Sequence, residues 1–309
     1  MEHISVLLNE AVDGLEIRPD GVYVDATLGR GGHSRKIAEK LTSGRLIAFD
    51  LDEQAIEETK LLLADLMEKI TIVHANFADM KQELLKLGIE KVDGILMDLG
   101  VSSPQFDDPA RGFSYRYDAR LDMRMDQTKE LSAYEVINNY RFDQLMKIFS
   151  HYGEEPFAKN IARKIEAARV KAPIETTLQL VDVIRSALPA KVLSKKGHPA
   201  KQVFQAIRIE VNGELDSLKQ ALSDGITLLN DRGTFCVITF HSLEDRMVKE
   251  MFKEVSTVYV PKKLPIAQLP QANYEVTTRK PIIADESELS ENQRSHSAKL
   301  RILRKTGGK

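Results

Sequence analysis

The feature that most constrains the fold is a glycine turn between an apolar run and a helical pattern. It reads VDATLGRGGHS over residues 24–34. Glycines at a strand-to-helix turn let a ligand approach the backbone closely, next to the N–H groups that begin the helix. The glycines stand at Gly29, Gly31 and Gly32 rather than as G-x-G-x-x-G, and a glycine cluster alone does not identify a nucleotide. The turn predicts a ligand site and leaves the ligand open.

Around this turn, the first hundred residues alternate between strand and helix patterns. The sequence predicts strands at residues 21–27, 45–51, 70–74 and 92–99, with helices at 32–41, 53–66 and 80–87. Such alternation predicts a parallel, doubly wound α/β sheet. A buried strand at 233–240 and two further strands at 257–260 and 298–303 are expected to extend the sheet.

From about residue 111 the pattern becomes helical. Amphipathic helices are predicted at 132–140, 142–152, 156–170 and 177–188, followed by a long helix with Pro199 in its first turn. One face of that helix carries the apolar residues Phe204, Ile207, Val211, Leu215, Leu218 and Leu222, and the opposite face carries Lys201, Gln205, Arg208 and Asn212. We therefore expect a discontinuous domain, residues 1–110 and 209–309, with an all-helical insertion at 111–208.

The distribution of charge is uneven along the chain. The net charge is −2, but residues 1–100 hold 11 Lys+Arg against 19 Asp+Glu, and residues 156–209 hold 11 against 3. Residues 293–309 add six basic residues and no acid. Basic regions on an acidic chain are typical of contact with a polyanion, although a solvated helical surface gives the same pattern.

Composition excludes several classes of protein. Acidic residues interrupt the N-terminal segment, so it does not read as a secretory signal, and no apolar run approaches the ~20 residues of a membrane span. The single cysteine excludes an intrachain disulfide. We expect a cytoplasmic protein of one or two domains with no membrane partner.

Two acids at predicted strand ends limit the classes of ligand that the site could bind. Asp50 ends the second strand, 19 residues after Gly31, where a carboxylate can accept both ribose hydroxyls of a nucleoside. Its alternative role is a helix N-cap, which Asp52 could fill equally well. Asp98 lies at the end of the fourth strand, and Leu, Gly, Val, Ser, Ser and Pro follow it. This loop resembles the catalytic loop of amino methyltransferases that use adenosylmethionine, without their adjacent prolines.

Longer motifs carry a family resemblance. The blocks DATLGRGGHS, MDLGVSSPQ, RGFSY with DARLDMRMD, HPAKQVFQAIRIEVNGEL, ITFHSLEDR and SAKLR occur in this order between His3 and Arg304. Together they closely resemble the bacterial RsmH (formerly MraW) family. One departure is Arg294-Ser295-His296-Ser297, where the family pattern is Arg-Ser-Arg-Ser.

The resemblance implies a fold and an activity. The fold is a class I (Rossmann-like) S-adenosylmethionine-dependent methyltransferase sheet with an inserted helical domain for RNA recognition. The activity is N4-methylation of a cytosine in the decoding centre of 16S rRNA, cytosine 1402 in the family's rRNA numbering, which tunes the ribosomal P site. Two alternatives stay open: a small-molecule methyltransferase or dehydrogenase, and a non-catalytic RNA-binding assembly factor.

The resemblance also implies the cofactor site. S-adenosyl-L-methionine is expected at Gly31, Gly32, His33, Asp50, Phe77, Asp98 and Gln105. Phe77 would lie against the adenine, or it is a plain core aromatic. His33 is alternatively an ordinary polar residue in the first turn of a helix. No group of residues has metal-ligand spacing, so no metal is predicted.

The chemistry needs a hydrogen-bond acceptor for a conjugated amine. Asp98 is the only acid well placed for this, so we predict a catalytic role for it, with Ser102 and Ser103 contacting the target base. Asp98 could instead hold only the cofactor or brace the turn. Cys236, the only thiol, lies in an apolar strand pattern, which argues against methylation of a ring carbon through a cysteine nucleophile.

The expected partner is 16S rRNA in the small ribosomal subunit, with no obligate protein partner and a homodimer permitted. The residues expected to contact RNA are Arg111, Phe113, Arg116, His198, Lys201, Gln205, Arg208, His241, Arg294 and Lys299. Within residues 111–126, internal pairing of interleaved arginines and aspartates is an equal alternative. His241 is expected to face RNA or the site wall, with Ser242 and Asp245 forming a variant capping box for the next helix.

Overall fold

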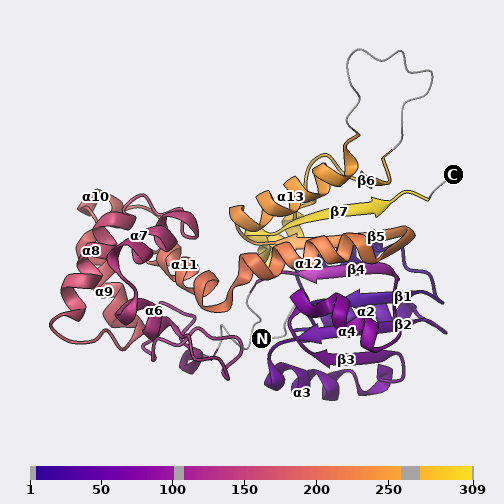
Figure 1. Cartoon of the computed structure of the whole chain (residues 1–309), viewed down its shortest axis with the longest axis horizontal. Coiled ribbons are helices and arrows are strands. Elements are labelled where there is room, and N and C mark those ends of the chain that lie inside the picture. The colour runs from indigo at the N-terminus through magenta and orange to yellow at the C-terminus, as the bar shows by residue number, and fades with distance from the viewer. Residues whose placement is uncertain (1–4, 101–107, 259–271, 308–309) are drawn as a thin grey trace, which may run out of the picture. The chain divides into compact units, whose positions relative to one another are not determined.

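The computed structural model describes residues 5–100, 108–258 and 272–307, and the chain divides into two compact units (Figure 1). The first unit comprises residues 1–100 and 216–309, and the second comprises residues 101–215. The predicted insertion, residues 111–208, lies inside the second unit. Its apolar core extends beyond the predicted edge to Val211.

The first unit is built on a seven-stranded sheet with the order β3-β2-β1-β4-β5-β7-β6. Strands β1 to β5 are parallel, and β7 pairs antiparallel with both β5 and β6. The strands are β1 (Val22–Asp25), β2 (Arg45–Asp50), β3 (Ile70–His74), β4 (Val92–Asp98), β5 (Leu229–Thr239), β6 (Tyr274–Val276) and β7 (Lys299–Lys305). This arrangement confirms the predicted Rossmann-like sheet.

Helices cover both faces of this sheet (Figure 1). Alternate residues of β2 show why: Leu46 and Ala48 join the core beneath α1, α2 and α3, while Ile47 and Phe49 join the core beneath α4, α12 and α13. The helices are α1 (Leu8–Gly14), α2 (Gly32–Lys40), α3 (Glu53–Leu62), α4 (Met80–Lys86), α12 (Glu214–Leu228), α13 (Ser242–Ser256) and α14 (Glu286–Glu291). Short 3₁₀ turns occur at η1 (Ala64–Leu66), η2 (Phe77–Asp79) and η4 (Gln293–Ser297).

The predicted strand at 257–260 is wrong in its described part. Thr257 is the C-cap of α13, and its hydroxyl donates a hydrogen bond to the Lys253 carbonyl at 2.6 Å. The Thr257 N–H also donates to the Glu254 carbonyl at 3.5 Å, so this backbone group bonds within the end of the helix rather than in the sheet. The sixth strand is instead the short β6, which the sequence analysis missed, and residues 259–260 lie outside the described part.

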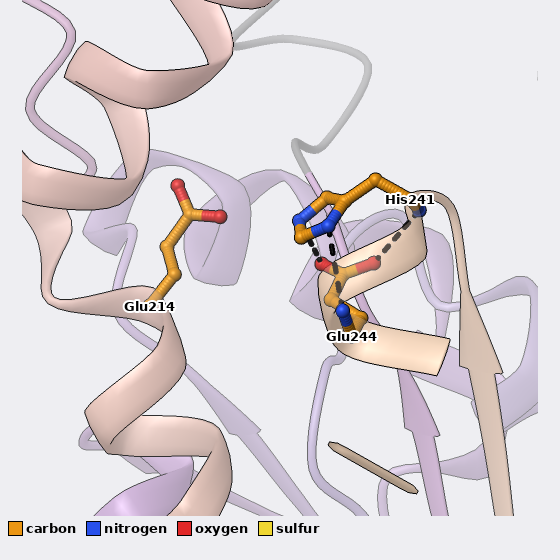
Figure 2. Close-up of side chains that lie close together, drawn as sticks. All are labelled: Glu214, His241 and Glu244. Carbon is orange, nitrogen blue, oxygen red and sulfur yellow. Dashed lines mark hydrogen bonds and ion pairs between the residues drawn. The ribbon is translucent and has the colours of Figure 1, made fainter. Parts of the chain in front are cut away.

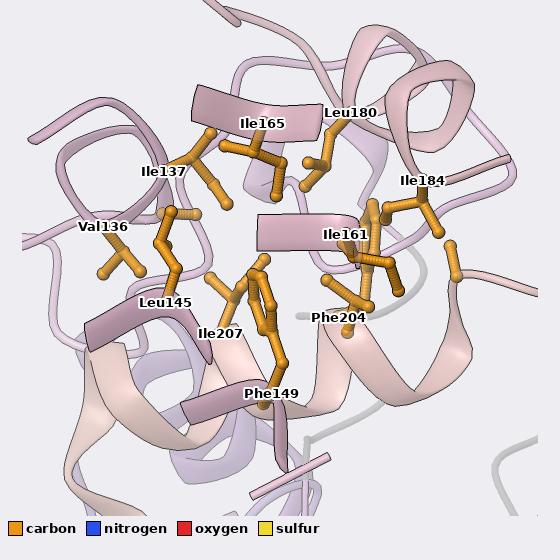
Figure 3. Close-up of a cluster of buried hydrophobic side chains, with 14 of the residues drawn as sticks. Val136, Ile137, Leu145, Phe149, Ile161, Ile165, Leu180, Ile184, Phe204 and Ile207 are labelled. Carbon is orange, nitrogen blue, oxygen red and sulfur yellow. The ribbon is translucent and has the colours of Figure 1, made fainter. Parts of the chain in front are cut away.

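The second unit is helical and has its own apolar core (Figure 3). Its elements are η3 (Pro109–Arg111), α6 (Ala133–Asn139), α7 (Phe142–His151), α8 (Ala158–Arg169), α9 (Thr177–Ala187), α10 (Ala190–Leu193) and α11 (Lys201–Asn212). Helices α6, α7, α8 and α9 match the four predicted amphipathic helices, whereas η3 and α10 were not predicted. No helix in the described residues has the length and apolarity that crossing a membrane requires.

The long helix predicted after Pro199 is two helices. Gly213 has a φ of +63° and forms the C-cap of α11, and α12 begins at the next residue. A left-handed glycine is a common helix end because it has no Cβ to clash. The predicted apolar stripe is therefore divided: Val211 and its predecessors belong to the core of the second unit, and Leu218 and Leu222 belong to the first.

The core of the second unit gives a stability prediction. Ile161 of α8 is fully buried, so Ile161→Ala is expected to lower the free energy of unfolding by about 2–5 kcal/mol. Val170, at the end of the same helix, is 82% exposed, and Val170→Ala is expected to change it by less than about 0.5 kcal/mol. Urea unfolding of both full-length variants checks this. Equal losses would contradict the described core.

Candidate cofactor and catalytic site

The turn needs glycine at two positions because side chains have no room there. Gly31 has a φ of +73°, and a Cβ at this position would lie 2.7 Å from Thr59 Cγ2. A Cβ on Gly32, the first residue of α2, would lie 2.1 Å from Ser5 Oγ. The Gly31 N–H donates to the Leu28 carbonyl at 2.8 Å. Glycine at both positions keeps the turn tight against the start of α2.

Asp50 lies at the end of β2, where it holds the glycine turn. Its two carboxylate oxygens accept hydrogen bonds from the Gly29 N–H at 2.8 Å and the Asp52 N–H at 3.0 Å. Each oxygen keeps acceptor capacity for a ligand hydroxyl. Burial raises the pKa of Asp50. The alternative role as an N-cap belongs to Asp52, which accepts from the N–H groups of Gln54 and Ala55 at the start of α3.

Asp98 ends β4 with a carboxylate that is only partly satisfied. Its N–H donates to Thr27 Oγ1 at 2.7 Å, which joins the end of β4 to the glycine turn. Its Oδ1 is buried and has no hydrogen-bond partner among the described residues, and its Oδ2 lies 3.7 Å from His33 Nδ1. The side chain as a whole is 24% exposed.

His33 adds a second unsatisfied atom beside Asp98. The side chain is buried on the first turn of α2, and its Nε2 has no hydrogen-bond partner in the described part of the chain. Burial lowers the pKa of His33 to about 4, so the ring is neutral at pH 7. Native proteins satisfy nearly all buried polar atoms, because an unpaired one is costly. Two such atoms at one strand end indicate a ligand site.

Neighbouring carboxylates determine the charge that this site accepts. Burial raises the pKa of Asp98 well above its usual range, and the charges of Asp25 and Glu244 raise it further, whereas Arg294 lowers it. A bound cation would favour the ionised carboxylate. The sequence analysis did not select Asp25 or Glu244. The signal for Asp25 was present, because it also ends a strand directly before the glycine turn.

His241 and Glu244 form a reciprocal cap at the start of α13 (Figure 2). His241 Nδ1 accepts from the Glu244 N–H at 3.4 Å, and Glu244 Oε2 accepts from the His241 N–H at 3.2 Å. The ring Nε2 lies 3.1 Å from Glu244 Oε1. The predicted cap by Ser242 and Asp245 is therefore wrong by one residue. Asp245 binds Lys299 and Arg301 of β7 instead.

Of the remaining residues predicted to contact the cofactor or the base, only Phe77 lies in the described part of the chain. Phe77 begins η2 after β3, half-buried against the core beneath α4. Ser102, Ser103 and Gln105 lie outside the described residues, so their roles stay predictions. Glu214, also drawn in Figure 2, belongs to the second unit, where both its oxygens accept bonds from Arg208 at 2.8 Å.

Several residues expected to contact RNA have partners within the second unit. Arg111 is buried and donates to the carbonyls of Arg124 and Met125, and Phe113 is buried in the core. Gln205 donates to the Tyr152 carbonyl at 3.0 Å. The alternative of internal pairing holds for Arg124, which binds Asp122 at 2.7 Å. These contacts hold the unit together.

Other predicted RNA contacts lie at the surface. Arg116 and Lys201 are exposed, and His198 is half-buried. In the first unit, Arg294 is half-buried in η4, and Lys299 of β7 is paired with Asp245 at 2.9 Å. The RNA role of each stays a prediction.

A profile of the MraW methylase family matches residues 1–306, which is nearly the whole chain. The chain belongs to the MraW methylase family. This is the RsmH family that the sequence motifs resemble, and the protein is an S-adenosylmethionine-dependent methyltransferase.

Three solved structures are similar to the chain. A candidate rRNA methylase from Clostridium thermocellum is 15% identical, with a TM-score of 0.46 over 98% of this chain and 100% of that one. An rRNA methylase from Streptococcus thermophilus is 12% identical, with a TM-score of 0.45 over 99% of each chain. A candidate methyltransferase from Streptococcus mutans, in complex with SAH, is 12% identical, with a TM-score of 0.45 over 98% and 99%.

The site fits this cofactor on its own geometry. The glycines at 31 and 32 keep the turn tight, Asp50 offers paired acceptors for ribose hydroxyls, and Asp98 offers an unpartnered acceptor in a negative environment. S-adenosylmethionine has a ribose diol, an ammonium group and a sulfonium centre that match these features. When bound, it supplies an electrophilic methyl group.

Alanine substitutions at two glycines test whether the turn has room for a Cβ. Gly31 and Gly88 have almost the same φ, +73° and +72°, but nothing lies within 4 Å of a Cβ on Gly88. Gly88→Ala is expected to cost about 1–2 kcal/mol through backbone strain alone. Gly31→Ala should cost about 1–3 kcal/mol more through the clash with Thr59 and should weaken binding of S-adenosylmethionine in calorimetry. Equal effects on both measurements would contradict this account.

Burial of neutral His33 predicts a pH dependence of stability. As pH falls from 6.5 toward about 4, the unfolded chain gains a proton on this ring that the folded chain does not. The free energy of unfolding therefore falls in this window, by up to about 3 kcal/mol. A His33→Gln variant should lose less stability over the same window in urea unfolding. The raised pKa values of Asp25, Asp50 and Asp98 affect the wild type and the variant alike. If the free energy of unfolding changed with pH in parallel for the two proteins, the prediction would be contradicted.

Proposed function

We propose that this methyltransferase methylates N4 of a cytosine in the decoding centre of 16S rRNA, cytosine 1402 in the family's rRNA numbering. The observation that carries the proposal is the buried, unpartnered Oδ1 of Asp98 at the end of β4. It is an acceptor held beside a cofactor site, where an N–H group of the substrate could bind. The expected substrate form is the small ribosomal subunit or a precursor of it.

The reaction needs this acceptor because the exocyclic amine of cytosine is a poor nucleophile. Its lone pair is conjugated into the ring. A hydrogen bond from the amine to Asp98 localises that lone pair on nitrogen. Methyl transfer would form the nitrogen–methyl bond and break the sulfur–methyl bond of the donor, leaving S-adenosylhomocysteine. The amine would lose one proton, which Asp98 would accept as general base. The positive charge of a bound cofactor favours the ionised form of Asp98 before this transfer.

The single cysteine supports an amino group as the acceptor. Methylation at C5 of cytosine uses a cysteine that adds to the ring. Cys236 lies in the middle of β5 with no solvent exposure, and burial raises the pKa of its thiol far above its usual range. It is the only thiol of the chain. The chain therefore has no reactive thiolate for a C5 mechanism.

The decisive experiment follows labelled methyl groups from S-adenosylmethionine into small ribosomal subunits purified from cells lacking this gene. Nucleoside analysis should show N4-methylcytidine at one site. Assembly intermediates and naked 16S rRNA serve as parallel substrates. Label in another nucleoside would overturn the choice of acceptor atom. No transfer to any of the three, despite tight cofactor binding, would favour a small-molecule substrate.

Asp98→Asn tests the proposed base. The amide cannot take up the proton, so kcat is expected to fall about 10²- to 10⁴-fold. Asp50→Asn is the comparison: it should raise the KM for S-adenosylmethionine and leave kcat within a few-fold, because Asp50 holds the ribose rather than the amine. Single-turnover kinetics on both variants separates the two effects. Wild-type turnover by Asp98→Asn would exclude a catalytic role for Asp98.

A further inference from the structure

A stacked pair of rings marks the surface of the second unit. The rings of Tyr115 and His198 have centroids 4.1 Å apart and planes 13° apart. Tyr115 also packs edge-on against Phe204, at 5.6 Å and 88°. Phe204 is buried in the core of the unit, whereas Tyr115 and His198 are half-buried. The pair is therefore a rigid aromatic surface that is anchored below and partly open to solvent.

The His198 ring is held in one orientation. Its Nδ1 accepts a hydrogen bond from the Ala200 N–H at 3.3 Å, just before α11 begins. Burial and the nearby charges of Arg185 and Arg116 lower the pKa of His198. Both effects favour the neutral form of the His198 ring.

The charges nearest to this ring are both guanidinium groups without a protein partner. Arg116 and Arg185 are exposed, and neither side chain makes an ion pair or a hydrogen bond in the described part of the chain. Even Asp182, one turn before Arg185 on α9, lies beyond ion-pair distance. Three other arginines of the unit form ion pairs: Arg124 with Asp122, Arg141 with Asp143 and Arg208 with Glu214.

Lysines extend this positive region along the chain. Four exposed lysines flank His198 in sequence, and none has an ion-pair partner among the described residues: Lys191, Lys195, Lys196 and Lys201. Unpaired cations beside an open aromatic stack are the two components that single-stranded nucleic acid binds: phosphates pair with the cations, and bases stack on the rings.

We propose that Tyr115, His198, Arg116 and Arg185 form an RNA-docking surface, on which one unpaired base stacks against the ring pair while neighbouring phosphates bind the two guanidinium groups. The inference rests on the proposed function, because it takes the substrate to be RNA. It adds Arg185 to the arginines expected from sequence. It also assigns the roles: the rings hold a base, and the arginines hold the backbone.

The test measures binding of a single-stranded, fluorescein-labelled oligocytidine RNA to the full-length protein by anisotropy at several salt concentrations. His198→Ala removes one ring and should weaken binding about 5- to 100-fold. The Arg116→Gln/Arg185→Gln double variant should lower the slope of log affinity against log salt by about 1.4, because each phosphate contact contributes about 0.7.

Two further variants serve as controls. Arg141→Gln removes one positive charge from the same unit, away from His198. The residue before Arg141, Tyr140, binds Glu210 near the C-terminal end of α11, whereas His198 precedes the N-terminal end of that helix. It should bind like the wild type. His198→Phe keeps an aromatic ring but loses the bond to the Ala200 N–H. Recovery of binding by His198→Phe would assign the effect to stacking, whereas a merely structural role predicts equal losses and a lower Tm for both His198 variants.

Each outcome decides the proposal. Wild-type binding by His198→Ala together with a reduced salt slope would mean a surface for any polyanion, such as an acidic protein, and would overturn the stacking site. Equal losses in Arg141→Gln would overturn the location. Methyl transfer to small subunits is measured separately. A wild-type protein that binds oligocytidine as expected but makes no N4-methylcytidine would refute the proposed function and leave this surface standing.

Discussion

The geometry of the site depends on one buried carboxylate, that of Asp25. It accepts hydrogen bonds from the Thr27 N–H at 3.1 Å and from Ser34 Oγ at 2.7 Å, so it ties the end of β1 to the first turns of α2. Thr27 Oγ1 in turn accepts the Asp98 N–H. The glycine turn, the start of α2 and the end of β4 are thereby held in one network. Burial raises the pKa of Asp25, which shows that this position is costly for a charge.

That cost has a functional consequence. Asp25, Asp98 and Glu244 crowd negative charge at one edge of the sheet, and His33 adds a buried neutral ring with an unpaired nitrogen. A site arranged for stability alone would pair these groups. Perturbed groups of this kind cluster where a ligand completes the electrostatics. A cationic methyl donor is such a ligand, which links the family assignment to the physical state of the site.

In the second unit, the basic residues divide into a set that stabilises the fold and a set at the surface. Its stability comes from a separate apolar core and from arginines that are internally bound, such as Arg111 and Arg124. Its basic character at the surface comes from other residues, including Arg116 and Arg185. Counting charges along the sequence could not separate the two sets. The difference lies in which carboxylates and carbonyls the fold brings within reach of each guanidinium.

Local patterns in the sequence determined much of this protein. Alternating apolar runs specified the parallel strands, the glycines specified the turn, and Asp50 and Asp98 could be found because strand ends are visible in sequence. Only the tertiary structure decided the rest. The apolar stripe across Gly213 continues unbroken in sequence, yet its two halves face different cores. The effects of Asp25 and Glu244 on Asp98 depend on elements that the fold brings together, and periodicity carries no information about contacts between residues far apart in the chain.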